Sequence, residues 1–168
     1  MVIKSDGTAI NTTVYDGKIK ASSGSRIDGL TIVDKGSFEF STDTTLVNAI
    51  IYDQKTSIVD KTSDGLVLNT NNLLKVDSGG TAINAIIDGG DLIVYSDGTA
   101  INSTITAGNI NVKSGGLLTN TLINGGLVEV ESRGKVNNTT VTKGDLKIKS
   151  GAEVADTTIN GGVYKCRI

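Results

Sequence analysis

The feature that most constrains this chain is a repeat of 18 residues. Glycine returns at that interval at Gly90, Gly108, Gly126, Gly144 and Gly162. A second series returns at Gly80, Gly98, Gly116 and Gly134, with Ala152 in the next place. A fixed short period indicates a solenoid, because one unit is too short to bury its own apolar side chains and must stack on its neighbours.

The repeat extends, with small irregularities, over all 168 residues. Residues 73–162 form an unbroken array, and residues 163–168 begin one further, partial unit. Residues 37–72 are less regular, since their units are longer or shorter by single residues. We therefore predict a single repeat domain spanning residues 1–168, with about nine coils of 18 residues each.

Within the regular units, apolar and polar side chains alternate as they do in a strand with one buried face. One apolar column contains Leu74, Leu92, Ile110, Val128, Leu146 and Tyr164. A second contains Val76, Val94, Val112, Val130, Ile148 and Cys166, which places this cysteine in the core. The mostly polar column between them contains Lys75, Ile93, Asn111, Glu129, Lys147 and Lys165.

These columns predict an all-β fold, namely a right-handed parallel β-helix, or β-solenoid, in which residues one period apart are neighbours. Glu129 is then expected beside Lys147, and Glu131 between Lys113 and Lys149. The Gly-Gly and Asp-Gly steps are expected to supply the positive φ angles of the tight corners.

A further polar column recurs in almost every unit. It contains Asn84, Asn102, Asn120, Asn138 and Asp156, with Asn11, Asp28 and Asn48 assigned to the same column upstream. We interpret it as a structural ladder in which side-chain amides bond between coils. A ligand site is the weaker interpretation, because a unique site would interrupt the repeat, whereas this column defines it.

The residues that carry most enzyme chemistry are missing or scattered. The chain has no histidine, which removes the most common general base and metal ligand. Most recurring acidic residues occupy turns, so we predict no catalytic, cofactor-binding or metal-binding residues and no enzymatic activity. Weak calcium binding stays open, although the unit lacks the nine-residue spacing of calcium-binding repeats.

The charge and hydropathy of the chain exclude two classes of partner. Sixteen basic and eighteen acidic residues give a net charge of -2, which offers no basic surface for nucleic acid. The apolar runs are far too short to insert into a membrane.

The phrase Ser78-Gly79-Gly80-Thr81-Ala82-Ile83-Asn84, with its counterparts at residues 5–14 and 96–105, resembles the short repeats of AIDA-type autotransporter adhesins. The resemblance covers nearly the whole chain and is weakest at residues 37–72. It implies a fragment of a passenger, the surface-displayed or secreted part of a self-associating autotransporter of Gram-negative bacteria. Members of the family also carry a signal peptide and a membrane barrel. Neither is recognised in this sequence, which agrees with the expectation of a fragment.

The resemblance also implies functions and partners. Passengers of this family mediate adherence to host cells, self-association and biofilm formation, and act in virulence. The expected partners are receptors on host or bacterial cells, further copies of the rod joined end to end or side by side, and a glycosyltransferase. Heptose would be attached to exposed hydroxyls of the repeat, for which the candidates are Ser78, Ser96, Ser114, Ser132, Ser150, Thr104, Thr140 and Thr158.

A second interpretation comes from another functional class. Carbohydrate-active enzymes and carbohydrate-binding modules also occur on β-helices. They predict a groove with clustered carboxylates or aromatic side chains, carried by a long insertion in one coil. In this sequence, the departures from the repeat add only single residues.

Overall fold

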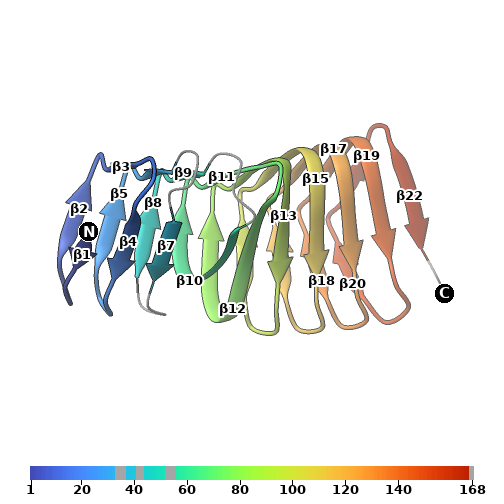
Figure 1. Ribbon diagram of the computed structural model, residues 1–168. Coiled ribbons are helices and arrows are strands. Elements are labelled where there is room, and N and C mark those ends of the chain that lie inside the picture. Colours follow the sequence, from blue (N-terminus) through green and yellow to red (C-terminus); the bar gives the residue numbers. More distant parts are fainter. Residues whose placement is uncertain (33–36, 41–43, 52–55, 167–168) are drawn as a thin grey trace.

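The computed structural model describes residues 1–32, 37–40, 44–51 and 56–166. These residues form strands and turns only, every strand pairing among them is parallel, and the predicted parallel β-helix is confirmed. Figure 1 shows the coils stacked in a single row, with the two termini at opposite ends of the rod. The irregular coils predicted for residues 37–72 include residues 41–43 and 52–55, which lie outside the described residues.

Three ladders of parallel strands run along the rod, and each ladder takes strands from successive coils. Ladder 1 has two parts, because no pairing joins β7 to β10 among the described residues. The first part is a separate three-stranded sheet of β1 (Val2–Ile3), β4 (Lys18–Ala21) and β7 (Ser37–Phe40). The second part contains the first part of β10 (Thr56–Asp64) and β12 (Asn72–Ile83), the last part of β13 (Ile86–Val94), β15 (Thr104–Val112), β17 (Leu122–Val130) and β19 (Thr140–Ile148), and β22 (Val163–Cys166). Ladder 2 contains β2 (Thr8–Ile10), β5 (Arg26–Asp28), β8 (Thr45–Val47), the last part of β10 and β12, β14 (Thr99–Ile101), β16 (Leu117–Thr119), β18 (Lys135–Asn137) and β20 (Glu153–Ala155). Ladder 3 contains β3 (Thr13–Val14), β6 (Thr31–Ile32), β9 (Ile50–Ile51), β11 (Val67–Asn69), the first part of β13, β15, β17 and β19, and β21 (Thr158–Ile159).

The register of the ladders reproduces the sequence period. Leu92 pairs with Leu74 in the preceding coil and with Ile110 in the next one. Val94 likewise pairs with Val76 and Val112. The prediction that residues one period apart become neighbours is therefore confirmed for the regular array.

The core is a continuous apolar stack inside the rod. Both predicted columns of ladder 1 are buried from Leu74 to Ile148, because alternate side chains of each strand point inward. Ladders 2 and 3 add the buried residues Ala82, Ala100, Leu118, Val136, Ile87, Ile105, Ile123 and Val141. Each fully buried Val, Leu or Ile contributes about 1.5–3 kcal/mol relative to an exposed one, so the stacking of coils accounts for the stability of the fold.

A column of small and hydroxyl side chains lines the inside of one corner. The buried hydroxyl side chains of this column belong to Ser103, Thr121 and Thr139. They lie in an interior that is otherwise mainly apolar. The hydroxyls of Thr121 and Thr139 donate to the carbonyls two residues earlier, at 3.2 Å in each case. These local bonds satisfy the two threonine hydroxyls without interrupting the ladders, whereas the Oγ of Ser103 makes no hydrogen bond in the described part of the chain.

The apolar columns are exposed in the last coil that the structure describes. Tyr164 is 44% exposed and Cys166 is exposed, although both continue the buried columns of ladder 1. The expectation that Cys166 packs in the core is therefore wrong. In the described residues, the strand of Cys166 pairs with a neighbouring coil on one side only, at Ile148.

Candidate interaction surface

The corner after ladder 2 is built from residues in the left-handed conformation. At Asn84, Asn102, Asn120, Asn138 and Asp156 the φ angles lie between 48° and 55°. Asparagine and aspartate are the side-chain-bearing residues that tolerate this conformation best. The backbone N–H of each corner asparagine donates to the next coil, as from Asn120 to the carbonyl oxygen of Asn137 at 3.1 Å.

The corner side chains also make contacts between coils. The Nδ2 of Asn138 donates to the Oδ1 of Asn120 at 2.7 Å, and the Nδ2 of Asn84 donates to the Oδ1 of Asp64 at 2.8 Å. The second bond joins the corner to the last residue of a strand rather than to another corner. The column is thus defined by its backbone conformation, and the amide contacts add to it where their geometry allows.

The assignment of Asp28 to this column is wrong. Asp28 pairs with Ile10 and Val47 inside ladder 2, and the corner position is taken by Gly29, whose φ is 68°. Counting 18 residues from Asn11 leads to Gly29, so the period was the signal that identified the corner. Asp28 instead accepts a hydrogen bond from the Nδ2 of Asn48 at 3.4 Å.

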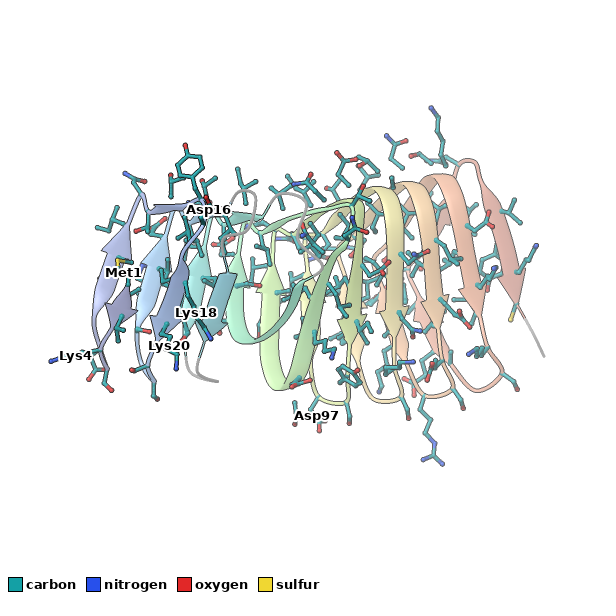
Figure 2. The ribbon with its side chains drawn as sticks, viewed as in Figure 1. Met1, Lys4, Asp16, Lys18, Lys20 and Asp97 are labelled. Atoms are coloured by element: carbon teal, nitrogen blue, oxygen red, sulfur yellow. The ribbon has the colours of Figure 1, made fainter. Side chains whose placement is uncertain are left out.

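The candidate serines form one line along the rod, at the turn between ladders 1 and 2. Ser78, Ser96, Ser114, Ser132 and Ser150 are all exposed. Each precedes a residue with positive φ, namely Gly79, Asp97, Gly115, Arg133 and Gly151. Figure 2 shows Asp97 of this turn at one edge of the rod, whereas Asp16 lies at the opposite edge. Because neighbouring strands are about 4.8 Å apart, the hydroxyls recur at that spacing.

The candidate threonines form a second line on a different corner. Thr104 and Thr140 are half-buried at the start of β15 and β19, and Thr158 is exposed at the start of β21. Each of these threonines comes two positions after a corner residue in the sequence, and the residue between them is buried or partly buried. The two sets of hydroxyls are therefore separate lines and do not form a single patch.

A chain of ion pairs crosses the outer face of ladder 1. The Nζ of Lys113 lies 2.6 Å from Glu131 Oε1, and the Nζ of Lys149 lies 2.8 Å from Glu129 Oε1 and 4.0 Å from Glu131 Oε1. The predicted place of Glu131 between Lys113 and Lys149 is confirmed. Glu129 pairs with Lys147 in the backbone register, but its carboxylate bonds diagonally to Lys149.

The electrostatics of Glu129 follow from this arrangement. The hydrogen bond from Lys149 is the largest influence and lowers the pKa of the Glu129 carboxyl, and Lys147 and Lys113 add to the effect. Partial burial opposes it. All these side chains remain substantially exposed, so the pairs contribute little stability and are screened by salt.

The described part of the chain contains no group of three or more His, Cys, Asp or Glu side chains that could hold a metal ion. Over the same residues, no helix is long and apolar enough to cross a membrane. In the described residues, the outer surface carries repeated polar columns, with exposed apolar side chains such as Ile86 and Leu122 among them.

Comparison with known proteins gives a structural likeness and no sequence family. No family model matches the chain, and no curated protein matches it. Among solved structures, the chain is similar to a hyper-glycosylated fragment of TibA whose glycosylation was catalysed by TibC. The TM-score is 0.65 at 22% sequence identity, over 99% of this chain and 70% of that chain. This likeness shows that the two chains share the fold.

Proposed function

We propose that this chain is a length of rod from a surface-displayed or secreted bacterial adhesin, which acts in adherence or self-association and catalyses no reaction. The observation that carries the proposal is the combination of a rigid β-helix with unbroken lines of exposed polar side chains along its length. In the described residues, those lines continue from coil to coil, so the same surface is presented many times.

Two independent observations point to this class. The sequence phrases resemble the repeats of AIDA-type adhesins, and the fold is similar to that of the TibA fragment, which comes from an adhesin of that type. The mechanism would be multivalent attachment. Many weak polar contacts on one rigid body add up because each later contact forms at a high effective concentration.

Glycosylation by a heptosyltransferase forms part of the proposal. The TibA fragment is modified by TibC, and this chain presents the exposed hydroxyls that such an enzyme needs. Ser114 is exposed at its turn, whereas the hydroxyl of Ser103 is buried. We propose that modification follows this difference in exposure, with the serine line modified first.

The test is co-expression of this chain with TibC, followed by intact-mass measurement and peptide mapping. We expect added heptose-sized masses, with sugar on Ser114 and none on Ser103. Substitution of the five exposed serines by alanine should lower the added mass, and Ser103→Ala should leave it unchanged. An unmodified chain, or modification of Ser103 in the folded protein, would contradict this part of the proposal.

Adherence is tested separately with beads coated with the purified chain and mixed with host epithelial cells. We expect coated beads to bind cells, with binding that falls steeply as the surface density of the chain is reduced, because multivalent attachment depends on density. Beads coated with a β-helix enzyme of similar charge are the control. Equal binding by both bead types would contradict an adhesive role.

Self-association is proposed through exposed apolar side chains of the first and last coils. Val2 and Ile10 are exposed at one end by 68% and 67%, and Val163 and Tyr164 at the other by 45% and 44%. We expect concentration-dependent association in sedimentation velocity. Val163→Lys with Tyr164→Lys should weaken it, and Ile86→Lys, at an exposed position within the array, should not.

A further inference from the structure

A hollow of about 280 Å³ lies on the outer face of ladder 1. It is formed by three successive strands, β13, β15 and β17, which present alternate side chains outward in register. The side chains around it are Asp91, Ile93, Asn109, Asn111, Leu127 and Glu129.

The hollow exists because the middle strand carries two short side chains. Asn109 lies between Asp91 and Leu127, and Asn111 lies between Ile93 and Glu129. In the column of Asn111, the next coil carries Glu129, and the two after it carry Lys147 and Lys165. A second hollow lies over the following coils and is lined by Glu129, Lys147, Ile148, Lys149 and Lys165, so the first one differs in being lined by asparagines and by no lysine.

One polar atom in the hollow has no partner. The Oδ1 of Asn111 is buried and makes no hydrogen bond in the described part of the chain. Such an acceptor costs about 1–3 kcal/mol when it is left unpaired. Because this oxygen is buried, the side-chain amide of Asn111 must first rotate toward the hollow. The oxygen could then accept a hydrogen bond from a ligand hydroxyl, which would recover this free energy.

The other polar groups define the ligand class. The Oδ1 of Asp91 accepts a hydrogen bond from the Nδ2 of Asn109 at 2.8 Å, and Glu129 is paired with Lys149. Their charges are thus partly compensated, while oxygens with spare acceptor capacity remain. No lysine or arginine lines the hollow, which disfavours an anionic ligand.

We propose that this hollow binds one neutral sugar residue of a glycan. Sugar hydroxyls would donate to Asn111, Asp91 and Glu129, and the apolar face of the ring would pack against Ile93 and Leu127. The volume lies just below the range of pockets for drug-sized ligands, about 300–1,000 Å³, which suits a single ring. The proposal adds a local ligand to the rod and stands whether or not the rod is adhesive or glycosylated.

The test is NMR titration of the purified, unglycosylated chain with the methyl glycosides of glucose, galactose, mannose and N-acetylglucosamine. Because one ring makes few contacts, an affinity of about 1 mM is expected. We expect at least one glycoside to shift the side-chain amide of Asn111 and the methyl groups of Ile93 and Leu127. Asn111→Ala should weaken that binding at least about fivefold, a loss of about 1 kcal/mol, whereas Asn137→Ala, on ladder 2, should leave it unchanged.

Three outcomes would overturn the proposal. They are shifts with none of the four glycosides, shifts confined to other faces of the rod, and equal binding by the wild-type chain and Asn111→Ala. Spermidine is included as a cationic probe, and binding of spermidine alone would show that the acidic side chains attract cations and that no sugar site exists. None of these readouts depends on cell adherence or on TibC, so failure here is distinguishable from failure of the proposed function.

Discussion

The side-chain amide of Asn138 donates a hydrogen bond of 2.7 Å to the side-chain oxygen of Asn120, one coil earlier. Both residues hold φ angles near 50°, at 48° and 53° respectively. The same amino acid thus meets two demands at once, because its backbone tolerates the left-handed corner and its amide can both donate and accept.

Substitution of Asn120 separates the contribution of the left-handed backbone conformation from that of the amide hydrogen bond. Asn120→Ala should lose about 1–3 kcal/mol of stability, since alanine pays the cost of the left-handed conformation and makes no amide contact. Asn120→Gly should lose less, because glycine adopts this conformation without strain. The measurement is the free energy of unfolding in urea.

The matched control is Asn137→Ala, which changes an exposed asparagine on strand β18. Its stability should change by less than about 0.5 kcal/mol. If alanine at position 120 proved as stable as glycine there, the corner would not depend on backbone conformation.

Two glycines with similar φ angles are expected to differ in how much stability is lost when each is replaced by alanine. Gly108 and Gly79 have φ of 88° and 76°, so alanine is strained at both. A Cβ at Gly108 would overlap the carbonyl oxygen of Gly90 in the coil below, whereas a Cβ at Gly79 meets no atom within 4 Å. We expect Gly108→Ala to be destabilising by about 1–3 kcal/mol more than Gly79→Ala in the same urea experiment. Equal costs would show that the close approach of coils at Gly108 is not rigid.

Arg133 offers a stabilising substitution. It holds φ of 63° at a turn where the preceding and following coils carry Gly115 and Gly151. An arginine gains nothing there that offsets the left-handed strain, so Arg133→Gly should raise the midpoint of thermal unfolding, by a net gain of about 0.5–1 kcal/mol. Lys135→Gly, two residues later in strand β18, should lower the midpoint, because glycine weakens an extended strand.

The ion pairs of ladder 1 predict a pH dependence. The pKa of Glu129 lies below its ordinary 4.5 in the folded chain, mainly because of Lys149. Its stabilising contribution is therefore present above that ordinary value and is lost as the pH falls through the lowered pKa. In a carbon-13 NMR titration, Lys149→Met should raise the pKa of Glu129, and Lys135→Met, which removes the partner of Glu153, should leave it unchanged. High salt should reduce the difference.

The regular array could be predicted residue by residue, whereas its exceptions could not. Leu92 and Val94 were identified as buried from their columns alone, because period and alternation fix which side chains face inward. Asp28 lies one residue before the corner, because its side chain resembles that of asparagine, although the 18-residue period from Asn11 leads to Gly29. The partner of Glu129 was also missed, because a long side chain can reach diagonally across the ladder to Lys149.

The sequence by itself determined the fold class, the period and the inward columns of this protein, because each is a property of residue spacing. Only the tertiary structure decided that Cys166 is exposed and that Asn109 and Asn111 leave a hollow. The physical reason is that burial and free volume depend on what the coils above and below supply. The residues of one strand do not by themselves specify which side chains the neighbouring coils will place against them.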